Sequence, residues 1–285
     1  MKIAISAEST LDLTPELIKE FDISVIPFNV ILGEEEALDG QVTSQTLFDY
    51  VAKTGKLPRT AAINEFQYEE YFKALLEKHE AVVHFALSSK ISTSCSNALQ
   101  AATCFGGKVI VIDTLSLSTG IALQAIYASK LAKAGKTHEE IAALVKERIP
   151  YDQTSFSLES VNYLYKGGRC SLLSMIGANV LRIKPDILML NGSMKPGQKR
   201  RGPMAKVCVE YAEEMLKTYS NYDPELVFIT YSSAPEEVVD AVYEVLKKKG
   251  FKRIEKTMAG ATISCHCGPH CLGILYMNDG PHPVE

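Results

Sequence analysis

The fold is decided by residues 81–102, which read Ala81-Val82-Val83-His84-Phe85-Ala86-Leu87, then Ser88-Ser89-Lys90-Ile91-Ser92-Thr93-Ser94-Cys95-Ser96, then Asn97-Ala98-Leu99-Gln100-Ala101-Ala102. The first block is a continuous apolar run, which predicts a buried strand. The second block holds five serines and a threonine within nine residues, and the third is typical of a helix. A strand that ends in hydroxyls and opens a helix can direct several donors toward one anion. A helix cap with additional serines is the alternative that this pattern leaves open.

Strand-like and helix-like segments alternate through the rest of the first half. The strand candidates are continuous β-branched or aliphatic runs, as expected for a parallel sheet with both faces covered: Lys2–Ser6, Ile23–Leu32, Ala81–Leu87 and Val109–Asp113. Helix starts are indicated at Thr14-Pro15-Glu16 and at capping boxes of Asn64 with Gln67 and Thr137 with Glu140. This order predicts an α/β domain over residues 1–150, with ligands beyond the carboxyl ends of its strands. The hydroxyl run occupies that position.

The second half has a different pattern and follows a connection at residues 149–153. Long helices are expected over Met204–Ser220 and Ser233–Lys249, the latter opened by a capping box of Ser233 and Glu236. The strand candidates are Ser155–Leu158, Ile187–Leu190, Leu226–Tyr231, Arg253–Thr257 and Leu272–Met277. Residues 151–285 are therefore predicted to form a smaller α+β domain.

Composition excludes several classes of protein. Hydrophobic residues make up 46% of the 285 residues, and the net charge of −4 argues against a general nucleic-acid binder. The apolar runs are shorter than the roughly 20 residues that a membrane helix needs, so no transmembrane segment is expected. The chain starts with a strand pattern rather than a signal peptide, and its seven cysteines lack regular spacing. We expect a cytoplasmic protein with reduced thiols.

Positive charge is concentrated between residues 161 and 206. This stretch holds nine basic residues and a single acid, Asp186, in a chain that is otherwise strongly acidic. A local basic surface suggests an anion or an acidic partner. A solvated face that balances the acidic remainder is the equally open alternative.

Common nucleotide-binding, zinc-protease and hydrolase motifs do not occur in the sequence. Thr60 precedes the helix start at Asn64, so its hydroxyl can face the same edge as the serines, although these residues alone favour an ordinary loop threonine. Lys166-Gly167-Gly168-Arg169 combines glycines with an arginine, which fits an anion clamp or a plain turn. Residues 195–202 follow a hairpin signal at Asn191-Gly192 and form a basic loop tip or a contact surface.

Cysteine and histidine are dense in Cys265-His266-Cys267-Gly268-Pro269-His270-Cys271. This density suggests a zinc site, but three of these residues are contiguous and no second ligand pair completes a four-ligand site. A loop that carries one useful histidine before a buried strand is the favoured interpretation. Histidine can donate a hydrogen bond, or a positive charge, to a carboxylate near neutral pH.

Taken in order, these motifs resemble the DegV family of bacterial lipid-binding proteins, and the resemblance covers nearly the whole chain. The matching segments are Glu8-Ser9-Thr10-Leu11-Asp12-Leu13, Ile26-Pro27-Phe28, Asp39-Gly40, Thr60-Ala61-Ala62-Ile63-Asn64, Ser88–Ser94, Tyr165–Arg169, Lys184–Leu188, Lys199–Gly202 and His266–His270. Each motif is weak by itself, whereas the ordered set is specific.

The resemblance implies an N-terminal three-layer α/β/α domain with a mostly parallel sheet and a C-terminal two-layer α+β domain with a mixed sheet. It also implies a long-chain fatty acid held between the domains, with its carboxylate at Thr60, Ser92 and His266. Candidate residues at the pocket or its mouth are Ser9, Ala61, Thr93, Ser94 and Gly168. No cofactor is implied other than the fatty acid as ligand.

Characterised members act as the binding subunit of a fatty acid kinase, in which a separate ATP-using subunit makes an acyl phosphate for phospholipid synthesis. The resemblance therefore implies a carrier rather than an enzyme, with a kinase subunit as partner and transient contact with a membrane surface. Arg169, Lys199 and Arg201 are candidates for contacting that partner or the phosphate.

The sequence departs from the family pattern where Glu8 replaces an aspartate, Ala61 and Asn64 replace serines, and Thr93 and His270 replace glycines. Two other functions remain open. One is a lipid hydrolase or acyltransferase with a serine nucleophile, such as Ser92, and His266 as base. The other is a zinc or redox module at Cys265–Cys271.

Overall fold

A parallel four-stranded sheet forms the centre of the first half of the chain. The computed structural model describes residues 2–169 and 183–282. The strand order is β2 (Ile23–Ile26), β1 (Ile3–Glu8), β6 (Ala81–Ala86) and β7 (Val109–Asp113), all parallel. Every residue of β6 is buried, as its continuous apolar sequence predicts.

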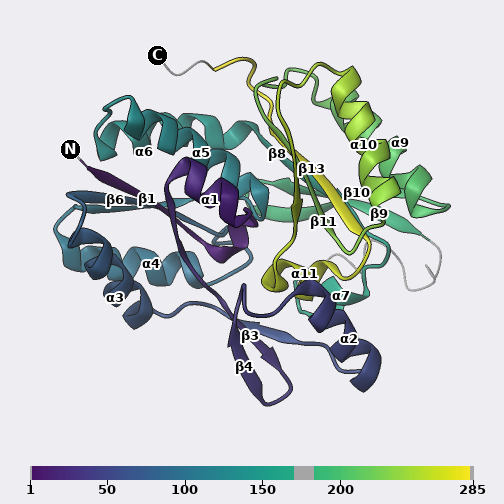
Figure 1. The fold of residues 1–285 in the computed structure, drawn as a ribbon, viewed down its shortest axis with the longest axis horizontal. Coiled ribbons are helices and arrows are strands. Elements are labelled where there is room, and N and C mark those ends of the chain that lie inside the picture. The colour runs from purple at the N-terminus through teal and green to yellow at the C-terminus, as the bar shows by residue number, and fades with distance from the viewer. Residues whose placement is uncertain (1, 170–182, 283–285) are drawn as a thin grey trace.

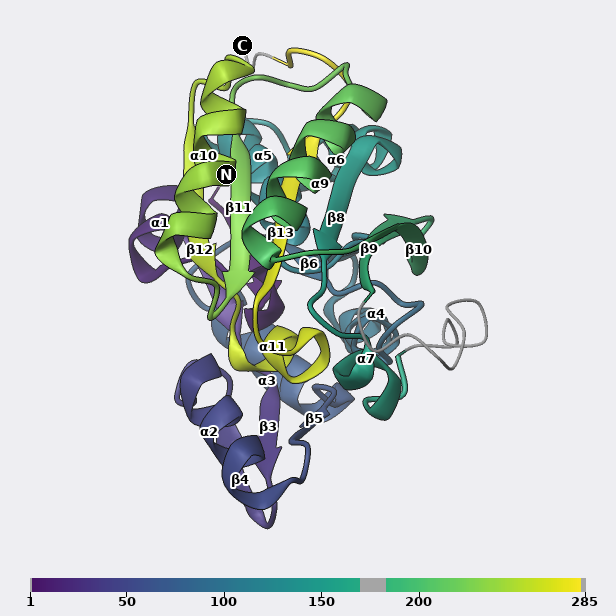
Figure 2. The ribbon, with the colours of Figure 1, turned by 90° about the vertical axis from the view of Figure 1, so that its right-hand side faces the viewer.

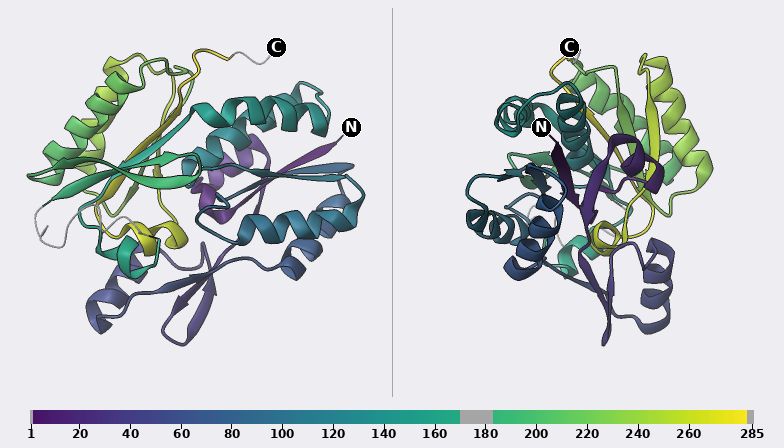
Figure 3. Two further views of the ribbon diagram at one scale, coloured as in Figure 1. Left: turned by 180° about the vertical axis from the view of Figure 1, so that it is seen from behind. Right: turned by 60° about the vertical axis from the view of Figure 1, so that its left-hand side comes forward.

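Helices cover both faces of this sheet and make three layers. In Figure 1, α5 (Thr119–Lys133) and α6 (His138–Arg148) lie on one side, and α3 (Glu65–Leu76) and α4 (Ser94–Ala102) lie on the other. The view from behind in Figure 3 shows the same arrangement, with the teal helices above the sheet and the blue helices below it. The expected α/β/α layers are therefore present.

Local capping signals set several helix starts correctly. The Thr14 hydroxyl accepts a hydrogen bond from the Leu17 backbone N–H ahead of α1 (Pro15–Phe21). Both expected capping boxes form, Asn64 with Gln67 before α3 and Thr137 with Glu140 before α6. In contrast, the box expected at Ser233 is absent: α10 (Glu236–Lys248) begins after Pro235, and Ser233 adopts a φ of 46°.

The strand expected over Ile23–Leu32 is in fact two strands in different sheets. Proline at position 27 lacks a backbone N–H, so the ladder is interrupted there. Beyond it, β3 (Asn29–Leu32) joins β4 (Glu35–Leu38) and β5 (Arg59–Ala61) in a separate antiparallel sheet. This small sheet and α2 (Ser44–Thr54) lie at the bottom of Figure 1, and β5 carries Thr60.

A mixed six-stranded sheet forms the second half. Its order is β10 (Ser193–Arg200), β9 (Lys184–Leu190), β8 (Asp152–Ser157), β13 (Cys271–Met277), β11 (Val227–Ser232) and β12 (Ile254–Met258), and only β11 and β12 are parallel neighbours. Figure 2 shows α9 (Met204–Thr218) and α10 over one face of the sheet. The opposite face lies toward α5.

Short elements complete the described chain. They are the 3-10 turns η1 (Ser9–Leu11), η2 (Thr103–Phe105) and η3 (Ile149–Tyr151), and the short helices α7 (Asn162–Lys166) and α11 (Ala261–Cys267). In the described part of the chain, no helix is both long enough and apolar enough to cross a membrane.

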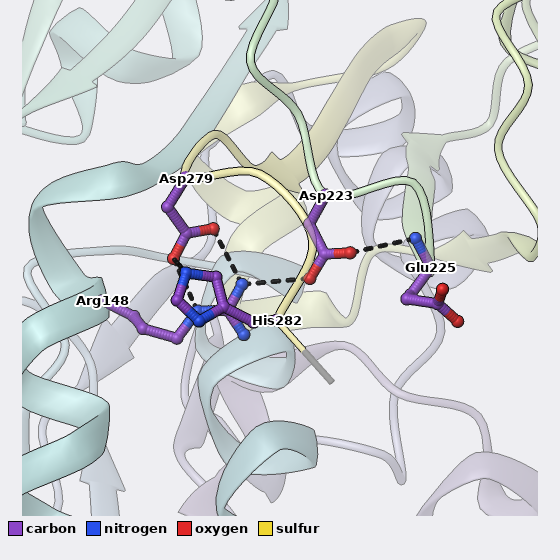
Figure 4. Close-up of polar contacts among 5 residues, drawn as sticks. All are labelled: Arg148, Asp223, Glu225, Asp279 and His282. Atoms are coloured by element: carbon purple, nitrogen blue, oxygen red, sulfur yellow. Dashed lines mark hydrogen bonds and ion pairs between the residues drawn. The ribbon is translucent and has the colours of Figure 1, made fainter. Parts of the chain in front are cut away.

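Arg148, at the end of α6, ties the two halves together (Figure 4). Its Nε donates to Asp279 at 2.7 Å and its Nη2 to Asp223 at 3.1 Å, and all three side chains are largely buried. His282 lies 3.2 Å from the same Asp279 carboxylate. One apolar core also runs from the parallel sheet into the mixed sheet. The division at residue 150 stays a prediction.

Candidate functional site

A pocket lies where the two sheets, α11 and the small antiparallel sheet meet. Its walls are mainly apolar and come from both halves of the chain: Phe28, Leu87, Leu117, Phe156, Met194 and Leu275. The empty space between these walls is about 840 Å³, counting the part open to solvent. Because the walls are mainly apolar, the pocket suits an aliphatic chain.

The hydroxyl run after β6 supplies one polar wall of the pocket. The Ser92 backbone N–H donates to the Ser88 carbonyl at 3.2 Å, which closes a tight turn before α4. The Ser92 side chain lines the pocket, and its oxygen accepts a hydrogen bond from the Ser94 backbone N–H at 3.1 Å. Because that bond uses a lone pair of the oxygen, the Ser92 hydroxyl can still donate its own proton to a ligand.

Thr60 and His266 form a second polar wall. Thr60 lies on β5 and His266 in the last turn of α11, and the distance from Thr60 Oγ1 to His266 Nε2 is 3.1 Å. Burial, with a smaller contribution from the Arg169 charge, lowers the pKa of His266 to about 4. The imidazole is therefore neutral at pH 7 in the absence of a ligand.

The other imidazole nitrogen, Nδ1, is buried and has no hydrogen-bond partner among the described residues. The backbone of Gly167 covers it so closely that a Cβ at this position would lie 2.6 Å from Nδ1. Which atom donates in the bond between His266 Nε2 and Thr60 depends on the imidazole tautomer. With the proton on Nε2, His266 donates to Thr60, and the Thr60 proton is left for a ligand.

Arg169 brings positive charge to the edge of the pocket. Its side chain is exposed, lines the pocket and donates to the Gly167 carbonyl at 2.9 Å. The expected residues Thr60, Ser92, His266 and Arg169 therefore meet at one pocket, although they come from four separate segments.

The other predicted residues do not appear among the described lining of this pocket. Ser9 donates to Asp39 at 2.9 Å and accepts from the Phe28 backbone, and Ser94 is buried against Tyr68. Ala61 is half-buried on β5 beside Thr60. The remaining four are exposed: Thr93, Gly168, Lys199 and Arg201.

The structure shows the local conformation at three of the positions that depart from the pattern given above. Asn64 caps α3 through its side chain. Thr93 has a φ of −81°, so this position does not require glycine. His270 has a φ of 58°, a left-handed conformation that favours glycine, so the replacement there carries backbone strain.

A buried carboxylate behind the hydroxyl run was not predicted as part of the site. Glu8 accepts from the Leu87 backbone N–H at 2.7 Å and from the Tyr68 hydroxyl at 2.5 Å, and that hydroxyl lies 2.7 Å from Ser94 Oγ. Burial raises the pKa of Glu8. The only signal in the sequence was its position in the opening motif, because the partners come from three distant segments.

Two further carboxylates hold α11 in place. Asp12 accepts from the Gly260 backbone N–H and Asp39 from that of Ala261, both at 2.9 Å. These bonds satisfy free N–H groups at the start of the helix that carries His266. Burial raises the pKa of Asp12 to about 8, and the Asp39 charge contributes to the same shift.

The geometry gives little support to the hydrolase alternative or to the metal alternative. A catalytic histidine is normally oriented by a carboxylate, whereas Nδ1 of His266 lies against Gly167. Within the described ranges, no group of three or more cysteine, histidine or acidic side chains could hold a metal ion. Cys265, Cys267 and Cys271 are buried free thiols, and burial raises the pKa of Cys265.

Known proteins of similar sequence and solved structure share this fold. A "Fatty acid-binding protein" of Thermotoga maritima is 27% identical over 96% of each chain. A crystal structure of a DegV lipid-binding protein from Thermotoga maritima is 25% identical with a TM-score of 0.87, covering 99% of this chain and 100% of that one. A structure described as fatty acid binding of a DegV family protein from Thermus thermophilus is 24% identical with a TM-score of 0.89, covering 98% and 100%.

The family model described as "Uncharacterised protein, DegV family" matches residues 2–279, which is almost the entire chain. Together with the layered fold and the pocket between the two sheets, this match shows that the chain belongs to the DegV family.

Proposed function

We propose that this protein binds a long-chain fatty acid in the pocket between its two sheets. The carboxylate lies at Thr60, Ser92 and His266, and the tail extends along the apolar walls. The observation that carries this proposal is that these three polar side chains line one pocket whose walls are otherwise mostly apolar. The relative from Thermotoga maritima, named a fatty acid-binding protein, supports the same ligand class.

The energetics favour such a ligand. Burying a carboxylate without partners is prohibitive, but hydroxyl donors offset much of that cost. The Ser92 hydroxyl has a proton to donate, and Thr60 has one as well when the His266 proton is on Nε2. Each methylene removed from water contributes about 0.8 kcal/mol, so the tail supplies most of the affinity. In this proposal residues 1–150 provide the two hydroxyls. Residues 151–285 provide His266 and the apolar side chains of the mixed sheet that line the pocket.

We further propose that the protein presents the carboxylate to a separate fatty acid kinase subunit in the cytoplasm, where acyl phosphate is made for phospholipid synthesis. The exposed side chain of Arg169 at the pocket edge is suited to an incoming phosphate or to an acidic partner. Lys199 and Arg201, both exposed, extend the candidate contact surface. Loading of the carrier from a membrane surface is part of the same proposal.

Mass spectrometry of lipid extracted from purified protein tests the binding function. We expect a long-chain fatty acid in near-stoichiometric amount. After removal of the lipid, added hexadecanoate should raise the melting temperature. A pocket that is consistently empty and that hexadecanoate does not stabilise would contradict the proposal.

Two serines of the hydroxyl run provide a matched pair of variants. Ser92→Ala should weaken binding of hexadecanoate more than binding of hexadecanol, because only the acid carries a charge. Ser96→Ala removes an exposed hydroxyl that is bonded to the Thr93 carbonyl, and it should leave both affinities unchanged. Equal losses for acid and alcohol in Ser92→Ala would argue against a role at the carboxylate.

A further inference from the structure

Helix α11 presents a second polar side chain to the pocket. Thr262 precedes His266 by four residues, which places both side chains on one face of the helix. Both residues line the pocket. The side chain of Thr262 is only 3% exposed, so its hydroxyl is shielded from bulk water.

The Thr262 hydroxyl differs from other hydroxyls in the same walls. It is buried and has no hydrogen-bond partner among the described residues. In contrast, Thr230 bonds to two threonine hydroxyls at 2.7 and 2.9 Å, and Ser155 bonds to the Tyr211 hydroxyl at 2.7 Å. Buried polar groups in folded proteins are nearly always paired, so this hydroxyl needs a partner that residues 2–169 and 183–282 do not supply.

The missing partner belongs to the inner part of the pocket. At one end of α11, His266 feels the charge of Arg169, which is exposed. At the other end, Gly260 donates to Asp12, which also accepts from Ser118, and both Asp12 and Ser118 are buried. Thr262 is therefore about one helical turn deeper than the carboxylate position, roughly 5–6 Å along the helix axis. A ligand whose carboxylate sits at His266 passes Thr262 with the first several carbons of its chain.

We propose that Thr262 binds an oxygen substituent on the acyl chain, and that the pocket therefore accepts hydroxy or oxo fatty acids substituted within the first several carbons. This inference rests on the proposed fatty acid function and adds a ligand class to it. A plain saturated chain offers no partner at this depth. A hydroxyl or carbonyl oxygen there satisfies Thr262 and loses less on leaving water than it would against an apolar wall.

Isothermal titration calorimetry with four acids tests this inference: hexadecanoate and its 3-hydroxy, 5-hydroxy and 16-hydroxy derivatives. The variants are Thr262→Val, which keeps the shape and removes the hydroxyl, and Thr262→Ser, which keeps the hydroxyl. We expect Thr262→Val to weaken the 3-hydroxy or the 5-hydroxy acid by about three- to ten-fold relative to hexadecanoate, the range expected for one hydrogen bond. Thr262→Ser keeps the hydroxyl, so it should bind the substituted acids relative to hexadecanoate as the wild type does. The affinity for the 16-hydroxy acid should change in each variant as the affinity for hexadecanoate does.

The outcomes separate the two proposals. If the wild type binds hexadecanoate but Thr262→Val weakens all four acids equally, the oxygen-binding role is wrong and the hydroxyl contacts only a bound water or the wall. The same conclusion follows if Thr262→Val does not affect the 3-hydroxy and 5-hydroxy acids. If the wild type binds none of the four acids, the proposed fatty acid function itself fails.

Discussion

Replacing Thr60 by valine tests the most specific feature of the proposed carboxylate site. Valine keeps the branched shape of threonine and removes only the hydroxyl, which lies 3.1 Å from His266 Nε2. Because the pKa of His266 is lowered to about 4, the imidazole is neutral at pH 7. With the proton on Nε2, the imidazole donates to Thr60, and the Thr60 proton is left for the ligand.

The size of the effect follows from the charge of the ligand. A hydrogen bond to a charged group contributes about 1.5–3 kcal/mol, and one between neutral groups about 0.5–1.5 kcal/mol. At about 1.4 kcal/mol per factor of ten, Thr60→Val should weaken hexadecanoate by roughly 10- to 150-fold and hexadecanol by roughly 2- to 12-fold. The acid-to-alcohol preference should therefore fall by about ten-fold.

The chain contains no tryptophan, so calorimetry of the delipidated protein is a better assay than intrinsic tryptophan fluorescence. Thr103→Val is a suitable control, because Thr103 is exposed and its hydroxyl bonds only to the Gln100 carbonyl in the described structure. It should leave both affinities unchanged. If Thr60→Val weakens acid and alcohol by the same factor, or weakens neither, then Thr60 does not bind the carboxylate.

Three further predictions concern stability. Glu8→Gln should lower the free energy of unfolding in urea by about 1–3 kcal/mol, because the amide turns one buried acceptor into a donor; an unchanged midpoint would contradict this. Arg148→Met should cost about 3–5 kcal/mol in the same assay, since it leaves the Asp223 and Asp279 carboxylates without their buried partner; a smaller loss than that of an exposed-pair variant such as Lys247→Met would refute it. Burial raises the pKa of Asp12 from its ordinary value of 3.8 to about 8 in the folded state, so the folded protein holds the extra proton and stability falls as pH rises through this interval. Between pH 6.5 and 8, Asp12→Asn should make the slope of unfolding free energy against pH less negative than in the wild type, and an unaltered slope would show that Asp12 does not titrate there.

Local sequence signals predicted much of the fold. Continuous apolar runs located the buried parallel strands, and caps such as Asn64 located helix starts, because both depend on neighbours within a few residues. The predictions of strand length and helix capping were wrong where the same local sequence is compatible with two backbone conformations. Pro27 ended a strand that hydropathy alone would continue, and Ser233 adopted a left-handed turn instead of capping a helix.

The sequence by itself determined the composition of the site: a hydroxyl run after a buried strand, a threonine before a helix and a histidine near the end of the chain. The family resemblance, rather than spacing, selected Thr60, Ser92 and His266 from the many candidates. Only the tertiary structure decided which of these meet. Thr60 and His266 are 206 residues apart, and they come together because β5 and α11 lie against each other.

The same physical reason separates the serines of the run. Ser92 lines the pocket, whereas Ser94, two residues later, is turned toward Tyr68 and the buried Glu8 carboxylate. A turn followed by a helix directs successive side chains to different sides, so one hydroxyl meets the ligand and the next holds the wall in place. Their chemistry is identical in the sequence, and the packing of distant elements assigns their roles.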